Sequence, residues 1–369
     1  SLGDNFNWEP GKGGGIVPAS IELLKQLPGI VLDLTTLPFL TLVSMDYSFP
    51  LRQGAFAIRH LATKREVNEL GVATYGWKSG EAPTGLTKYL GAWPIAFGRG
   101  ARALVDTKFA EELNRARRVQ WHEIGGPPPN EWKRGEPLHM STYGVEGNRD
   151  LTQKEEFFIS RFSKFWGIRH SEQAAVTFIN ELRSGLVEDF MRQYKRAGVE
   201  LPHAELAFYQ SYVNRMTGWG NLYEADKAWV LQGLNSLLFS ARRNMALVQM
   251  PGYLLGNPLA RGTRREAWLD MLSFVGFGMG LLGLTELARE AGVADIEVGV
   301  NPSDSDFGKI KWGTTRLDIW AGYKSFAQWF VRVGNGLWSG DFNTFANELG
   351  KASEHLLRSK IAPIPGLVW

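Results

Sequence analysis

The sequence contains no cysteine among its 369 residues. This excludes disulfide bonds, thiolate ligands to zinc and a cysteine nucleophile, and it makes the fold independent of the redox state of its compartment. The chain also lacks a marked excess of charge, because 41 basic and 38 acidic residues leave a formal net charge of +3. That balance is unusual for a protein that binds nucleic acid by neutralising phosphates over a broad surface. It still allows local basic patches.

Recognisable metal and cofactor motifs are lacking too. None of the six histidines has a second histidine or a carboxylate at a metal-ligand spacing on one helix: His60, His122, His139, His170, His203 and His355. The best match to a dinucleotide fingerprint, Gly278-x-Gly280-x-x-Gly283, lies inside one continuous helical pattern rather than between a strand and a helix. We therefore expect neither a metal nor a cofactor.

The glycines of that segment predict a packing role instead. Gly276, Gly278, Gly280 and Gly283 remove side chains so that a neighbouring backbone can approach closely. The apolar run from Met271 is shorter than the roughly 20 residues that span a bilayer. We expect a buried core helix; the alternative is a helix that enters a membrane only after a conformational change.

The chain begins with Ser1 rather than with an initiator methionine. Its first residues also lack the pattern of a signal sequence, in which basic residues precede an apolar run. With the apolar ending IAPIPGLVW, this predicts a fragment of a longer protein. A hydrophobic content of 44% suffices for a sizeable core, and 14 Trp with 42 Gly are typical of crowded helix contacts and interfaces. We therefore expect an oligomer.

Hydrophobic periodicity predicts a mainly α, multi-helix, bundle-like protein with long irregular Gly- and Pro-rich segments and a small β-hairpin near 296–320. One expected helix presents Phe109, Leu113, Ala116 and Val119 to the core, and another, starting at Ser171, presents Ala174, Phe178, Leu182, Leu186 and Phe190. The predicted helices cover 55–70, 106–122, 152–166, 171–190, 223–254 (kinked at Pro251), 264–289, 323–335 and 342–358.

Composition divides the chain into three parts. Residues 1–20 predict an irregular arm, residues 21–150 a helical and irregular region rich in glycine and aromatics, and residues 151–369 a helical domain that includes the β-hairpin. The boundary falls in 125–149, where three consecutive prolines and many polar residues predict an exposed loop. A single domain over 21–369 is the alternative.

The segment NPSDSDFGKIKWGTTRLDIWAGY, residues 301–323, begins with an acidic turn. Short β candidates at 296–300 and 309–312 flank this turn, and residues 316–320 either continue the pairing or lead into a helix. Asp304, Asp306 and Asp318, with Glu297, suggest a carboxylate cluster for acid–base chemistry or a divalent cation. Aspartate and serine also form turns by bonding their own backbone. We favour a structural turn in which Arg316 and Asp318 form a fixed ion pair.

Three basic clusters stand apart along the chain. They are Arg115, Arg117 and Arg118; Arg242 and Arg243; and RGTRR, which includes Arg264 and Arg265. The default expectation is a solvated or interfacial helix face, and the alternative is a phosphate-facing lining of a DNA channel.

Six segments in order resemble a large polyvalent-protein-associated domain, which is found toward the C-terminal part of giant proteins of bacteriophages and related mobile elements. They are DYSFPLRQGAF (46–56), INELRSGLVEDF (179–190), VNRMTGWGNL (213–222), LNSLLFSARRNMALVQM (234–250), SDFGKIKWGTTRLDIWAGY (305–323) and LLRSKIAPIPG (356–366). The resemblance implies a helical module, without catalytic residues of its own, in a virion protein delivered with the genome. It assigns structural roles to the motif residues: turns at Gly54 and Gly218, and hydrogen-bonding anchors at Arg52 and Gln53.

Our leading hypothesis is a non-enzymatic structural segment of a phage internal virion or ejection protein. It would be packaged in the capsid near the portal and enter the host envelope or cytoplasm on ejection. Expected partners are further copies, portal or tail proteins, DNA at the arginine patches, and a membrane only after rearrangement. The alternatives are a scaffold domain of a giant virion-borne enzyme, such as a virion polymerase, and a hydrolase domain acting on host wall or nucleic acid.

Overall fold

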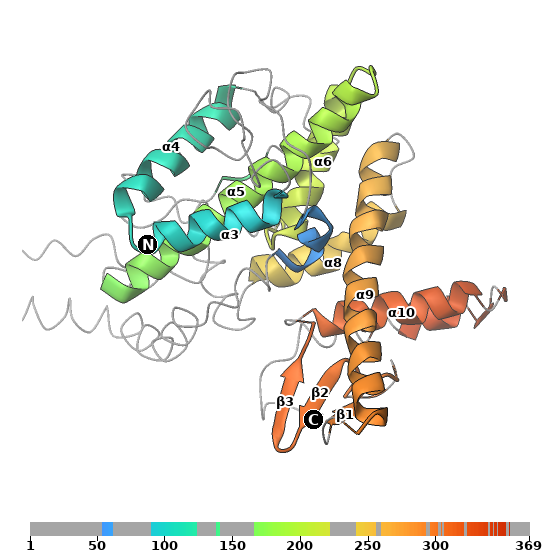
Figure 1. The fold of residues 1–369 in the computed structure, drawn as a ribbon. Coiled ribbons are helices and arrows are strands. Elements are labelled where there is room, and N and C mark those ends of the chain that lie inside the picture. Colours follow the sequence, from blue (N-terminus) through green and yellow to red (C-terminus); the bar gives the residue numbers. More distant parts are fainter. Residues whose placement is uncertain are drawn as a thin grey trace, which may run out of the picture.

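A computed structural model shows a mainly α-helical protein with one small antiparallel sheet, as the periodicity predicted (Figure 1). It describes residues 54–61, 90–123, 138–140, 166–221, 241–255, 260–292, 296–301, 304, 306–320, 323–338, 340–341, 343–344, 346–351 and 354. The predicted arm 1–20, most of the expected exposed loop 125–149 and the expected helices over 152–165 and 223–240 lie outside these residues. So do Arg52 and Gln53.

Helix α5, Trp166–Arg196, is the central element, and every residue from Gln173 to Phe190 is buried. The predicted core positions Ala174, Phe178, Leu182, Leu186 and Phe190 are at most 1% exposed, so that prediction is confirmed. Within the described residues the helix begins at Trp166, five residues before the predicted start at Ser171.

Four further helices contact α5 or one another around it. They are α3 (Ala92–Ala103), α4 (Thr107–Glu123), α6 (His203–Met216) and α8 (Ala241–Leu255). Helix α3, which lies along α5, was not predicted, because glycines and aromatics obscure its period; α6 was not predicted either. Helix α8 contains Pro251, as expected of the kinked pattern.

The buried face of α4 differs from the predicted one. Ala110, Asn114 and Arg117 are buried, whereas Phe109 and Leu113 are half-buried and Ala116 is exposed. The reason is that α5 presents polar groups here: Asn114 donates to Thr177 Oγ1 at 2.8 Å and accepts from Asn180. A polar stripe, rather than the apolar one, therefore holds α4 in place.

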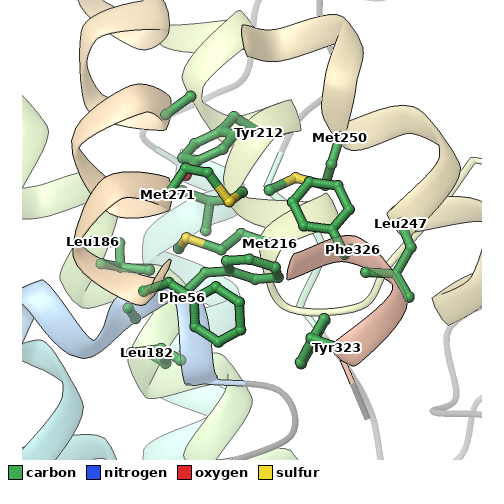
Figure 2. Close-up of a cluster of buried hydrophobic side chains, with 14 of the residues drawn as sticks. Phe56, Leu182, Leu186, Tyr212, Met216, Leu247, Met250, Met271, Tyr323 and Phe326 are labelled. Atoms are coloured by element: carbon green, nitrogen blue, oxygen red, sulfur yellow. The ribbon is translucent and has the colours of Figure 1, made fainter. Parts of the chain in front are cut away.

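The aromatic core joins elements that are far apart in the sequence. Phe56, in the short 3-10 helix η1 (Ala55–Leu61), lies with its ring centroid 4.6 Å from both Phe274 and Tyr323. Phe274 belongs to α9 (Arg261–Glu290), and Tyr323 precedes α10 (Lys324–Trp338). Figure 2 shows Met216, Met250 and Met271 among the rings of Phe56, Tyr212 and Phe326. One buried cluster thus extends from Phe56 to Val333.

The sheet has the order β1-β2-β3, with β1 at Ile296–Val298, β2 at Lys309–Trp312 and β3 at Thr315–Asp318. Trp312 pairs with Thr315 across a tight turn at Gly313, whose φ of +57° suits glycine. The segment from Arg316 therefore continues the pairing, one of the two predicted outcomes. Beyond α10, residues 343–344 and 346–351 are helical, within the expected 342–358.

Helix α9 is not the buried core helix that we predicted. Its second half exposes Leu284 by 67% and Leu287 by 61%. Of the four glycines predicted to pack against a helix, Gly276, Gly278, Gly280 and Gly283, only Gly278 approaches another element closely, and its neighbour is the Trp320 ring rather than a helix backbone. A Cβ at Gly276, Gly280 or Gly283 would meet nothing within 4 Å. The prediction of glycine-mediated helix packing is therefore wrong for this chain on its own.

Candidate functional site

The acidic turn lies at the surface and is built from backbone and ion-pair contacts. Lys309 Nζ donates to Asp306 Oδ1 at 2.8 Å, and this contact holds the pKa of Asp306 below its ordinary value. Arg316 Nη1 lies 3.9 Å from the same Asp306 oxygen. Asp318 Oδ1 instead accepts from the backbone N–H of Trp320 at 2.9 Å.

These contacts correct one prediction and agree with another. Arg316 pairs with Asp306 rather than with Asp318, because Asp318 turns toward the backbone that follows β3. The carboxylates of Asp306 and Asp318 have different partners, and the carbonyl of Asp304 accepts from the Gln328 side chain. The turn is therefore held together by its own acidic residues, as the structural interpretation expected.

The two glycines predicted at turns differ in role. Gly218 follows α6 with φ +88°, and the N–H of Trp219 donates back to the Asn214 carbonyl at 2.7 Å, which closes the helix end. At Gly54, by contrast, a Cβ would lie 2.6 Å from Trp93 Nε1. Gly54 is thus required by close packing of the chain before η1 against α3.

The basic clusters are less exposed than expected. The Arg242 side chain is buried, with its guanidinium carbon 3.9 Å from the centre of the Trp219 ring, and Arg243 lies similarly over Tyr323 at 4.9 Å. Cation–π packing thus directs both inward. Arg264 is half-buried, whereas Arg115, Arg261 and Arg265, the last 73% exposed, have the solvated position that we expected as the default.

A packed aromatic site surrounds Trp219. The His139 ring stacks on it with 3.4 Å between centroids, and the His139 backbone N–H donates to Asn214 Oδ1 at 2.9 Å. Burial, followed by the nearby charges of Arg183 and Arg242, lowers the pKa of His139 well below its ordinary value. Residues 138–140, expected in an exposed loop, therefore pack against α5 and α6 with a neutral imidazole.

The first of two buried ionic networks joins α3, α4 and α5. Arg117 donates through Nε to Glu181 Oε1 at 2.9 Å and through Nη1 to Glu188 Oε1 at 2.9 Å, and Arg99 also pairs with Glu181. Burial alone would raise the pKa of Glu181, but Arg117 and Arg99 outweigh it and hold that pKa below its ordinary value. Arg117 and Glu181 are therefore charged inside the protein.

The second network joins η1, α5, α6 and α9. Arg59 donates through Nε to Asp270 Oδ1 at 2.9 Å and also pairs with Glu266. Burial and the adjacent Asp270 raise the pKa of Tyr212 well above its ordinary value, so its hydroxyl keeps the proton that it donates to Asp270 Oδ2 at 3.0 Å. The His60 ring lies 3.3 Å from Asp270 and 3.6 Å from Asp189.

A histidine between two carboxylates is an arrangement used in general acid–base catalysis. Here His60 is 4% exposed and Asp270 is fully buried, so a substrate at the surface does not reach them. Within the described ranges, no group of three or more His, Asp or Glu side chains is arranged to hold a metal ion. The network neutralises charge between helices instead.

Sequence reasoning missed both networks. It assigned Arg117 to a solvated cluster and gave Glu181, Glu188 and Asp270 no role. One signal was available: Glu181 and Glu188 are seven residues apart and so share a face of α5, next to strongly apolar positions. Two carboxylates on the inner side of a helix require cationic partners.

Comparisons with protein-family models, with curated proteins and with solved structures found no match to this chain. The resemblance to the polyvalent-protein-associated domain therefore stays a prediction from the sequence.

Proposed function

We propose that this chain is a non-catalytic structural module of a phage internal virion or ejection protein, packaged in the capsid near the portal and acting in genome delivery. The observation that carries the structural part is the pairing of buried charges. Arg117, Glu181 and Glu188 satisfy one another between helices, as do Arg59, Glu266 and Asp270. These groups hold the fold together and are not directed toward a substrate.

The acidic turn supports the same reading. Asp306 is engaged by Lys309 and Arg316, and Asp318 caps the backbone at Trp320. The virion setting rests on the six sequence segments that resemble the phage domain. It also fits the exposed apolar side chains of α9, since contiguous apolar surface of this kind marks interaction sites.

Particle composition tests the setting. Purified particles of the phage that encodes this chain should contain its peptides by mass spectrometry, and cross-linking on intact particles should join them to portal or tail proteins. Absence of the peptides from the particles, together with a monodisperse monomer in solution, would remove the proposal. A catalytic module found on the uncut parent polypeptide would instead favour the scaffold role.

A second experiment separates structure from hydrolysis. Asp306→Ala and Asp318→Ala should lower the thermal midpoint, because each removes a contact that shapes the turn. They should not abolish any hydrolysis of cell wall or nucleic acid shown by the purified chain. Loss of such an activity at an unchanged thermal midpoint would favour the hydrolase alternative.

A further inference from the structure

The second half of α9 presents large apolar side chains to solvent without a partner in the described part of the chain. Five of them are between 38% and 67% exposed: Leu272, Phe277, Leu281, Leu284 and Leu287. Buried residues of the same helix, such as Met271, Val275 and Leu282, lie on the side opposite Leu284 and Leu287. The exposed set is contiguous along the helix, so it forms a face rather than scattered surface residues.

The middle of this face also has positions without a side chain. Gly276, Gly280 and Gly283 lie within it, and a Cβ at any of them would meet nothing within 4 Å. Each glycine costs helix stability relative to alanine, by up to about 1 kcal/mol. Three open glycines between exposed leucines give a surface against which a second helix can pack closely.

The charges at the two ends of α9 select one kind of occupant. On the exposed face, Arg261 and Arg265 lie in the first turns and Glu290 in the last turn, while Arg289, on another side of the last turn, pairs with Glu286. Each sign is at the end where it interacts unfavourably with the helix dipole. A partner helix with acidic residues opposite the arginines and basic residues opposite the glutamate would relieve both ends. A second α9 in the antiparallel direction has that pattern.

The spacing along the helix is self-complementary in this direction. At 100° per residue, Arg265, Leu272, Gly276, Gly283 and Glu290 fall within about 40° of one another, on one stripe of the exposed face. An antiparallel register that sets Arg265 beside Glu290 of the second copy also sets Leu272 opposite Gly283. The two helices then cross near Gly276 and Gly280, where the surfaces approach most closely.

We infer that α9 pairs antiparallel with α9 of a second copy of this chain, through Leu272, Gly276, Gly280, Gly283, Leu284 and Leu287, with Arg265 and Glu290 as reciprocal ion pairs. The inference rests on the proposed role as a virion assembly module and names the partner of its apolar surface. A two-fold pairing of this kind is isologous, since each copy contributes the same residues.

A lipid bilayer is the competing occupant, because α9 is long and apolar enough to cross a membrane. Two observations favour the second copy. The first half of α9 is tied into the core by buried polar contacts, including Thr263 to Glu205 and Asp270 to Arg59. In addition, a bilayer gives no reason for Arg265 and Glu290 to lie on the same side of the helix at its opposite ends.

The decisive experiment measures the mass of the purified full chain by size-exclusion chromatography with light scattering. The wild-type protein should show the mass of two chains at about 100 µM, which exceeds a micromolar Kd. Leu284→Glu should show the mass of one chain. Val199→Glu is the matched control, since it places the same charge on an equally exposed apolar side chain in the turn after α5, and it should leave the dimer intact.

Charge reversal tests the direction of pairing. Arg265→Glu and Glu290→Arg should each weaken dimerisation about tenfold, because two solvent-facing pairs change from attraction to repulsion. The double variant Arg265→Glu/Glu290→Arg should restore it, since an antiparallel pair regains opposite charges. A parallel pair would keep like charges together, so failure of the rescue would overturn the register. Circular dichroism confirms that each variant is folded.

Three outcomes overturn the pairing. They are a single-chain mass for the wild-type protein at the highest concentration, a dimer that survives Leu284→Glu, and flotation of monomeric wild-type protein with vesicles of phosphatidylcholine and phosphatidylglycerol. The last would assign the face to lipid. All three outcomes are measured on purified protein, so they test the pairing of α9. The proposed role in the virion is tested separately, by the composition of the particles.

Discussion

Replacing Glu181 by glutamine should destabilise the protein strongly, although the two side chains have the same shape. The Glu181 carboxylate is 1% exposed and binds both Arg117 and Arg99. Glutamine keeps the length and one acceptor oxygen but removes the charge. Arg117 then retains Glu188 as a charged partner, while the buried Arg99 guanidinium loses the carboxylate with which it pairs.

The expected loss follows from leaving a charge without a partner inside the protein. Removing one member of a buried ion pair typically costs about 3–5 kcal/mol. Since domains of this kind are stable by only about 5–15 kcal/mol, that is a large share of the total. Urea unfolding followed by circular dichroism should show a lower midpoint with an unchanged slope, because the same surface is exposed on unfolding.

Two matched variants complete the test. Glu286→Gln removes the charge from the exposed pair with Arg289 on α9, and its urea midpoint should stay close to that of the wild type. Replacing Arg99, Arg117, Glu181 and Glu188 together by methionine should recover part of the loss, since all four members of the network are removed and none is left as an unpaired charge. If Glu181→Gln unfolds at the wild-type urea concentration, the network does not hold α3 and α4 to α5, and the reasoning fails.

Acid should remove the same interaction. The folded-state pKa of Glu181 lies below the ordinary value of 4.5, so its contribution is fully present above about pH 4.5 and is lost as the pH falls through the lower folded-state pKa. Wild-type stability should therefore decrease in that acidic range, and Glu181→Gln should show a smaller decrease. An equal decrease in both proteins would assign the acid sensitivity to other carboxylates.

Two further predictions concern packing and a buried imidazole. Gly278→Ala should destabilise the protein by about 1–3 kcal/mol, because the added Cβ would lie 2.3 Å from Trp320. Gly98→Ala in α3 is the control: its Cβ would meet nothing within 4 Å, so it should stabilise the protein by up to about 1 kcal/mol. Urea midpoints measure both effects, and equal shifts of the two midpoints would contradict the contact with Trp320. Burial and two arginines keep His139 neutral in the folded protein, whereas the unfolded imidazole gains a proton below about pH 6.5. Wild-type stability should therefore fall by up to about 1.4 kcal/mol per pH unit below that pH, and His139→Gln should reduce this dependence of stability on pH. The same pH dependence in both proteins would refute the assignment to His139.

Local patterns were enough to predict much of the fold. The four-residue repeat from Ala174 to Phe190 identified core residues of α5, because helix geometry alone places such residues on one face, but it did not show that the polar faces between Gln173 and Phe190 are buried as well. The β segments near 296–320 were predicted for a similar reason, since alternation and turn residues act over a few positions. The acidic turn has the backbone and ion-pair contacts that a structural turn predicts, but Arg316 pairs with Asp306 and not with Asp318.

Partners that are distant in sequence could not be predicted in this way. Arg117 and Glu181 are 64 residues apart, and nothing local distinguishes this buried arginine from the exposed Arg115 beside it. The apolar run of α9 led to a similar error. Composition shows that a segment can be buried, but only the arrangement of the other helices determines whether one side of it remains open.

The buried charges also explain how α4 is aligned along α5. Its apolar core residues recur every four positions, so a slide of one turn, about 5.4 Å, would place another apolar residue near each vacated site. The ionic contacts do not repeat in this way. Arg117 is held at 2.9 Å from Glu181 on one side and at 2.9 Å from Glu188 on the other, and the same slide would break both contacts. We therefore infer that the aromatic and aliphatic side chains supply most of the stability, while Arg117 and its two carboxylates determine the register of α4 on α5.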